Sequence, residues 1–92
     1  MKFACVLALV LSAAMPVLAE KKIIQPKEFP TGGPLSPGVL VDGTLYVSGQ
    51  IGRDLKTQKV PENFEAEVRQ VLDNTGIILR EAKMNYADVV SV

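Results

Sequence analysis

The stretch that decides the fold covers residues 33–52 and has the sequence GPLSPGVLVDGTLYVSGQIG. Within it, Asp42 and Gly43 lie between two apolar runs that are rich in β-branched residues. A two-residue type I′ turn needs a positive φ angle at both central positions, which aspartate tolerates and glycine adopts freely. The stretch therefore predicts a tight antiparallel hairpin. The residue pairs expected across it are Val41 with Thr44, Leu40 with Leu45, and Val39 with Tyr46.

The two faces of this hairpin follow from the period of two along a strand. The face expected to join the core carries Leu40, Leu45, Val47 and Ile51. The opposite face carries Val39, Val41, Thr44, Tyr46, Ser48 and Gln50. Because this second face is partly apolar, we expect another surface to cover it.

The residues before the hairpin predict a short strand and a stiff loop. Residues 21–26 are expected to form the strand, which ends at Pro26 because proline cannot donate to a ladder. Residues 27–38 contain three prolines and three glycines. Taken alone, this composition favours a plain connecting loop over a ligand-binding one.

A long amphipathic helix is predicted after the hairpin. Asn63 is expected to cap it, with Glu65 and Glu67 beside its positive end. The core-facing stripe is predicted to contain Phe64, Val68, Val71, Leu72, Thr75, Ile78, Leu79 and Ala82. The exposed side is predicted to contain Arg69, Asp73, Gly76 and Arg80. We expect the stripe to pack on the core face of the hairpin, and residues 87–92 to begin another strand.

The first 19 residues have the three regions of a secretory signal peptide. Lys2 gives the positive start, residues 3–18 are apolar apart from Ser12, and Ala19 is a suitable residue for cleavage. The apolar run is short for a bilayer, so we expect no stable membrane anchor. These features predict an exported protein, periplasmic or secreted, with residues 1–19 as its leader.

The composition excludes several kinds of chemistry. The chain of 92 residues has no histidine, and its single cysteine, Cys5, lies in the predicted leader. A Ser-His or Cys-His nucleophile pair is therefore excluded, and a metal site would need carboxylates alone, so we expect no metal and no cofactor. The net charge is 0 and the basic residues are not clustered, which argues against nucleic acid as a partner.

Several motifs in one order resemble the RidA/YjgF/YER057c/UK114 family. They are GPLSPGV at residues 33–39, LYVSGQIG at residues 45–52, LDN at residues 72–74 and DVV at residues 88–90. The resemblance implies an α+β, chorismate mutase-like fold with the order β-α-β-α-β-β, which assembles as a homotrimer. Residues 20–92 would form the N-terminal β-β-β-α-β portion of a single RidA-like domain, with its C-terminal part missing.

The resemblance also implies a ligand site. The positions that match the family pocket are Leu35 in the loop and Ser48, Gly49, Gln50 and Ile51 after the hairpin. From the residues alone, two interpretations are equally good. Ser48 and Gly49 could cradle a small polar ligand, or Gly49 could form a strand bulge and Ser48 could carry a hydroxyl that is satisfied within the protein. The family grips its substrate carboxylate with an arginine in a P-x-R motif and orients water with a late glutamate. Neither motif occurs here, so we expect no catalytic residue within this chain.

The chain departs from the family pattern in three places. Leu35 replaces the tyrosine of many family deaminases and offers only apolar contact. Leu55 and Gln58 stand where the family often has proline and glycine, so the turn over residues 53–61 either takes another geometry or accepts a left-handed conformation at Gln58. Lys83 also stands in place of a glycine, so Asn85 is expected to end the helix instead.

Two hypotheses about function follow. In the first, the complete protein hydrolyses short 2-imino or enamine acids to 2-keto acids and ammonia. This reaction makes little demand for a strong base, which suits a chain without histidine. In the second, the complete protein is a noncatalytic trimer that binds a small ligand. A third activity sometimes attributed to the family, ribonuclease or translation inhibition, is disfavoured by the neutral charge. Whether the complete protein is an enzyme stays open, and the deaminase hypothesis is the leading one.

Overall fold

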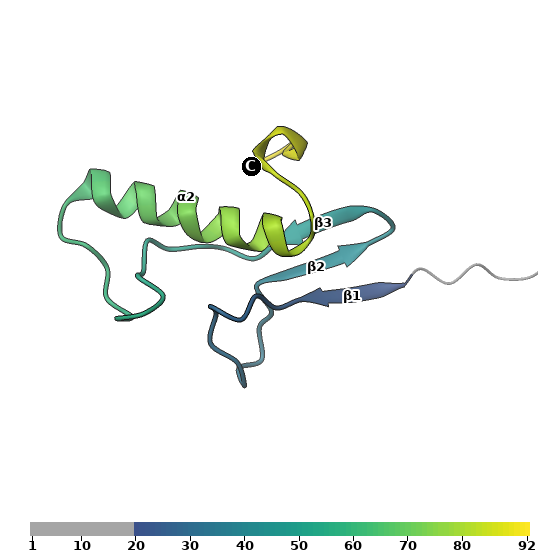
Figure 1. Ribbon diagram of the computed structural model, residues 1–92, viewed down its shortest axis with the longest axis horizontal. Helices are drawn as coiled ribbons and strands as arrows, with labels where there is room; N and C mark the ends of the chain where they lie inside the picture. The colour runs from purple at the N-terminus through teal and green to yellow at the C-terminus, as the bar shows by residue number, and fades with distance from the viewer. Residues whose placement is uncertain (1–19) are drawn as a thin grey trace, which may run out of the picture.

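The computed structural model describes residues 20–92 as a three-stranded antiparallel sheet and one long helix (Figure 1). The predicted leader, residues 1–19, lies outside the described residues. The elements in chain order are β1 (Lys21–Ile24), β2 (Gly38–Val41), β3 (Thr44–Val47), α2 (Phe64–Glu81) and a 3₁₀ turn, η1 (Tyr86–Asp88). The strands lie in the order β1-β2-β3. No helix among residues 20–92 has the length and apolar character that crossing a bilayer requires.

The hairpin of β2 and β3 has the predicted register. Val41 faces Thr44, Leu40 faces Leu45 and Val39 faces Tyr46. The φ angles of Asp42 and Gly43 are 49° and 78°, both positive, as a type I′ turn requires. The first strand is also confirmed, because β1 pairs with β2 and ends at Ile24, two residues before Pro26.

The core lies where the C-terminal half of α2 crosses the sheet. Ile24, Ile78 and Leu79 are buried there. A Cβ atom added to Gly38 would lie 3.0 Å from Cγ2 of Ile78 and 3.3 Å from Cδ1 of Leu45, so the absence of a side chain lets the helix approach β2 closely. Since Gly38 and Leu40 share a face of β2, the helix packs on the predicted core face of the hairpin at the end near Gly38.

Two residues assigned to that core face are largely exposed. Val47 is 37% exposed and Ile51 is 57% exposed, so their assignment to the core is wrong. The reason is the path of the chain after β3. Residues 48–53 run beside α2 in Figure 1, and they contact the helix through backbone atoms and a glycine while the side chain of Ile51 stays outside.

The predicted stripe of α2 is only partly correct. Ile78 and Leu79 are buried, but Phe64 is 78% exposed, and Val68 and Leu72 are exposed as well. Gly76, which was expected on the exposed side, is buried. The cause is Tyr86: its Cε2 atom would lie 3.5 Å from a Cβ added to Gly76, and its hydroxyl donates to the carbonyl of Leu72.

The ends of α2 are set by two local motifs. The Asn63 side chain accepts a hydrogen bond from the Ala66 N–H at 3.1 Å, which confirms the predicted cap. At the other end Lys83 has a φ angle of 61°, and its N–H donates to the Arg80 carbonyl at 2.9 Å. Lys83 therefore takes the left-handed position itself, and the expectation that Asn85 replaces it is wrong.

The strand predicted over residues 87–92 is not formed in the described part of the chain. Asn85 and Asp88 form a capping box instead: the Asn85 side chain accepts from the Ala87 N–H at 2.8 Å, and Asp88 accepts from the Asn85 N–H at 2.9 Å. This reciprocal cap favours a 3₁₀ turn over an extended chain. Residues 89–92 pair with no strand among residues 20–92.

The left-handed conformation of Lys83 predicts a stabilising substitution. Replacement of Lys83 by glycine, which has no Cβ to crowd the following carbonyl, should raise the free energy of unfolding of the full-length protein by about 1 kcal/mol. Chemical denaturation measures the change. Ala82→Gly is the matched control, because Ala82 has a φ angle of −86° and should gain nothing. Equal effects of the two substitutions would contradict the assignment.

Candidate functional site

The five residues that match the family pocket lie on two segments that the structure holds together. Leu35 is in the loop before β2, and residues 48–51 follow β3. Ser48 joins them, because its backbone N–H and its Oγ hydroxyl both donate to the carbonyl of Pro37, at 3.0 and 3.1 Å. The loop and the segment therefore form one local unit. Leu35 extends from this unit into solvent and is 84% exposed.

The polar side chains of the segment bond to each other. The Gln50 amide nitrogen Nε2 donates to Ser48 Oγ at 3.1 Å and lies 3.3 Å from the Ser48 carbonyl. The Ser48 hydroxyl is thus a donor to Pro37 and an acceptor from Gln50, which leaves it one further acceptor position. None of the five candidate residues carries an ionisable side chain, so hydrogen bonding and apolar contact are what they can offer a ligand.

The backbone of the segment has free donors. The N–H groups of Gly49, Gln50 and Ile51 donate to no acceptor among residues 20–92. Gly49 is exposed, and a Cβ added to it would meet no atom within 4 Å. Free backbone donors on an open surface can bind the oxygen atoms of a small anionic ligand.

Two residues outside the predicted set fix the far end of the segment. Asn74 of α2 is 1% exposed and donates through Nδ2 to the carbonyls of Arg53, at 2.8 Å, and Ile51, at 3.4 Å. Gly52 is buried against the same helix, where an added Cβ would lie 2.3 Å from the carbonyl oxygen of Glu67. The segment is therefore held at both ends.

A signal for Asn74 is present in the sequence. Asparagine is unfavourable inside a helix, and Asn74 lies four residues before the core residue Ile78, on the same side of α2. A polar side chain in a core-facing row must find hydrogen-bond partners, and carbonyls of a neighbouring segment are suitable acceptors.

The segment continues into a turn built around Asp54. The Asp54 carboxylate accepts from the backbone N–H groups of Lys56, at 2.8 Å, and Thr57, at 2.9 Å. These two donors, Thr57 first and Lys56 next, hold the pKa of Asp54 below its ordinary value. Gln58 has a φ angle of 62° and donates its N–H to the Asp54 carbonyl at 2.8 Å. Of the two alternatives for this turn, the structure thus shows the left-handed residue.

Two surface hollows of the described residues lie away from these segments. One hollow is lined by Gln25, Lys27, Glu28, Ile77, Arg80 and Glu81. The other is lined by Glu20, Lys22, Leu40, Asp42 and Gly43. None of the five candidate residues lines either hollow.

The contact at Gly52 predicts an asymmetry between two glycines of the segment. Gly52→Ala should destabilise the full-length protein by about 1–3 kcal/mol, because the new methyl group would overlap the backbone of Glu67. Gly49→Ala is the matched control and should change stability by less than about 0.5 kcal/mol, since its Cβ would enter open space. Chemical denaturation compares them. An equal loss of stability in both variants would mean that Gly52 does not lie against α2.

Comparison with known proteins identifies a matching family model and several similar proteins. The family model described as endoribonuclease L-PSP matches residues 26–92. The 2-iminobutanoate/2-iminopropanoate deaminase of Bos taurus is 43% identical over 72 residues, which cover 76% of this chain and 53% of the relative. A RutC family protein of Aquifex aeolicus is 39% identical over 72 residues, which cover 78% of this chain and 58% of the relative. The chain thus spans about half the length of the curated relatives that it matches.

Two solved structures share the fold. A member of the Rid protein family from Yersinia pestis superposes with a TM-score of 0.71 at 34% identity, over 77% of this chain and 58% of that one. An L-PSP endoribonuclease structure from Entamoeba histolytica gives a TM-score of 0.65 at 29% identity, over 72% and 54%. They confirm the predicted α+β fold, of which residues 20–92 form an incomplete part. By its sequence and its fold, the chain belongs to the endoribonuclease L-PSP family, the RidA/YjgF family of its motifs.

Proposed function

We propose that the full-length protein hydrolyses short 2-imino acids, or their enamine tautomers, to 2-keto acids and ammonia. In this reaction water adds to the carbon of the C=N bond, the C–N bond then breaks, and nitrogen leaves as ammonia while the carbon becomes a ketone. Relatives named 2-iminobutanoate/2-iminopropanoate deaminase support the proposal at about 43% identity. Because the chain spans about half their length, the activity is proposed for the complete protein.

The observation that carries the proposal is that the backbone N–H groups of Gly49, Gln50 and Ile51 have no acceptor among residues 20–92, in a segment held beside the loop of Leu35. A 2-imino acid is a small carboxylate, and N–H donors of a fixed segment can bind its oxygen atoms. Imines also hydrolyse readily in water, so capture of the substrate and placement of a water molecule can supply the catalysis. The five candidate residues, which include neither histidine nor cysteine, are compatible with this low demand.

Leu35 bears on which substrates the complete site accepts. Its side chain is exposed at the end of a loop that contains Pro34 and Pro37, so the backbone around it is stiff. Leucine offers contact area but no hydrogen bond. We therefore propose that the preferred substrates are imino acids with an apolar side chain, such as those formed from small aliphatic amino acids.

The proposal predicts that the full-length protein accelerates keto-acid release from an imine generated by a dehydratase acting on a 2-amino-3-hydroxy acid. Ser48→Ala removes the hydroxyl that ties the segment to Pro37, so kcat/KM should fall by roughly tenfold, which corresponds to about 1.4 kcal/mol. Thr57→Ala is the matched control, because its hydroxyl also bonds to backbone in an exposed turn, away from the five candidate residues.

Other outcomes point to other functions. If the wild-type protein does not accelerate the release but still binds 2-oxobutanoate, the noncatalytic binding module replaces the deaminase. Cleavage of RNA, with binding that weakens steeply as salt rises, would favour the endoribonuclease activity that the family description names. If Ser48→Ala and Thr57→Ala behave alike in an active enzyme, the candidate segment is not the site.

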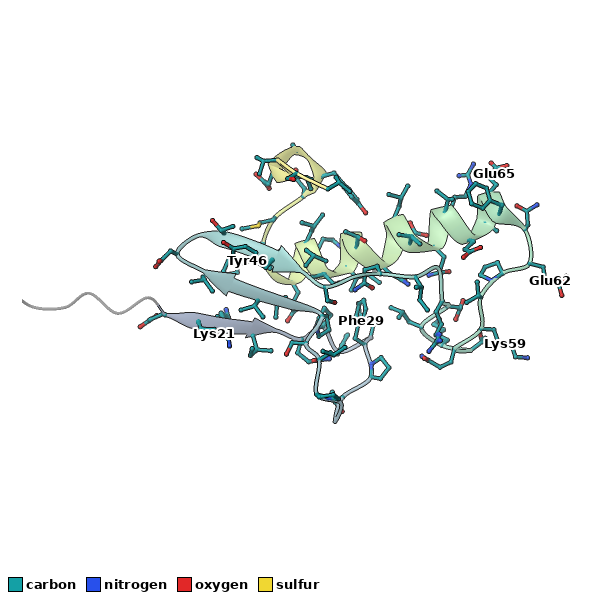
Figure 2. The ribbon with its side chains drawn as sticks, turned by 180° about the vertical axis from the view of Figure 1, so that it is seen from behind. Lys21, Phe29, Tyr46, Lys59, Glu62 and Glu65 are labelled. Carbon is teal, nitrogen blue, oxygen red and sulfur yellow. The ribbon has the colours of Figure 1, made fainter. Side chains whose placement is uncertain are left out.

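The outer face of the sheet supports a second proposal, a homotrimer. Ile23, Val39 and Tyr46 are paired in register, so an apolar row crosses all three strands on the face away from α2. Tyr46, labelled on β3 in Figure 2, is 63% exposed in the single chain. Burial of such a row against neighbouring copies would remove it from water.

The trimer proposal predicts that a charge in this row dissociates the assembly. Tyr46→Glu in the full-length protein should lower the mass measured by light scattering from that of a trimer to that of a monomer, because an unpaired carboxylate would be buried at the interface. Lys22→Glu is the control, since Lys22 lies opposite Leu40 on the other face of the sheet. A trimer that persists in Tyr46→Glu would place the interface elsewhere.

A further inference from the structure

Contacts outside the sheet hold the backbone of residues 48–53 in place. This segment follows β3 directly and pairs with no strand among residues 20–92. Its first residue, Ser48, is hydrogen-bonded to the carbonyl of Pro37. Within the described residues, contacts at the two ends of the segment therefore fix the backbone of Gly49, Gln50 and Ile51.

At the other end, Gly52 lies against α2 and one buried side chain, Asn74, supplies the hydrogen bonds. The Asn74 amide nitrogen has two hydrogens, and it reaches two carbonyls of the segment, those of Ile51 and Arg53, which lie 23 and 21 residues away in the chain. Asn74 Oδ1 accepts from the Gln70 amide nitrogen at 2.8 Å. This bond from Gln70 requires an oxygen at that position, so it turns the Nδ2 group of Asn74 toward the segment.

The Ile51 carbonyl, which Asn74 contacts, also closes a tight turn. The Arg53 N–H donates to the Ile51 carbonyl at 2.8 Å, so that oxygen receives a bond from the backbone and a bond from Asn74. The turn presses Gly52 onto the backbone of Glu67. Asn74 and Gly52 therefore fix where the segment passes α2, directly after residues 49–51.

Stability alone is a poor reason for asparagine at this position. A buried amide must recover its desolvation through hydrogen bonds, and asparagine disfavours the helix interior, whereas an aliphatic residue there would extend the core of Ile78 and Leu79. What asparagine adds is a directional bond to two chosen carbonyls. That is the property required of a residue that orients a binding segment.

We infer that Asn74 is a positioning residue for the ligand site: it does not touch the ligand, and it orients the backbone donors of residues 49–51 through the carbonyls of Ile51 and Arg53. The inference rests on the proposed function, because it places the substrate carboxylate on those donors. It goes beyond that proposal by assigning a role to a buried residue of α2. Gln70 supports it by orienting the Asn74 amide.

The test compares two buried residues of the same helix in the full-length protein. Asn74→Ala removes both bonds to the segment. Ile78→Val is the control, because Ile78 is fully buried and packs against Gly38, on the sheet. Both variants should lower the melting temperature. At a temperature where both are folded, Asn74→Ala should lower kcat/KM for imine hydrolysis at least tenfold, with most of the loss in KM, while Ile78→Val keeps it within twofold.

A second readout does not depend on activity. Titration with 2-oxobutanoate, the keto acid that hydrolysis of 2-iminobutanoate would release, is followed by the NMR amide signals of Gly49, Gln50 and Ile51. These signals should shift on titration in the wild type and in Ile78→Val. In Asn74→Ala they should start at different positions and respond at least tenfold more weakly.

The outcomes separate this inference from the proposed function. If the wild type hydrolyses imines and Asn74→Ala retains kcat/KM within twofold, Asn74 is only structural and the inference is overturned. If the wild type is inactive but binds 2-oxobutanoate, the proposed reaction fails, and loss of binding in Asn74→Ala still supports the positioning role. If the wild type neither reacts nor binds, both are overturned.

Discussion

The structure depends on the turn at Asp42 and Gly43, where two consecutive residues have positive φ angles. This turn fixes the register of β2 and β3, because a two-residue loop allows only one set of partners. In that register Gly38 lies on the covered face between Ile24 and Leu45, where Ile78 packs against it. A slip by one residue would put Val39 on this face and hold the helix away. The close packing of α2 on the sheet therefore follows from the geometry of the turn.

Along its length, α2 contacts two different parts of the protein, the sheet and the segment after β3. Its C-terminal half covers the sheet with aliphatic side chains, of which Ile78 and Leu79 are buried. Its middle contacts the segment after β3 with polar and backbone atoms, through Asn74 and Glu67. The first contact is nondirectional and supplies stability, as burial of apolar area does. The second is directional and specifies where one short stretch of backbone lies.

Local chemistry explains what the sequence could predict. The turn at Asp42, the cap at Asn63 and the end of the first strand before Pro26 are decided by residues within a few positions of each other. The sequence was a poorer guide wherever a distant segment decides the outcome. Gly76 is buried because Tyr86 lies over it, and the long apolar stripe of α2 contains more residues than one row of contacts can bury.

The candidate site also contains features that nearby residues decide and features that distant segments decide. The resemblance predicts Leu35 and residues 48–51 as ligand-site residues, and in the structure the bonds from Ser48 to Pro37 join the two segments into one unit. Asn74 was part of a recognised motif, yet its partners lie more than twenty residues away, and no local rule names them. The left-handed conformation of Lys83 was also missed, because residue preference alone assigns that position to glycine or asparagine.

The part of the proposed site within residues 20–92 offers a ligand mainly backbone N–H groups, which places a particular demand on the fold. A charged side chain can adjust its rotamer to reach a carboxylate, whereas a backbone donor points where its chain directs it. The precision of such a site must therefore come from residues that bond to the chain and not to the ligand. Within residues 20–92, that task falls to Ser48 at one end of the segment and to Asn74 and Gly52 at the other. Two of these three contacts come from α2, so in the proposed site the helix would orient the binding segment as well as pack on the sheet.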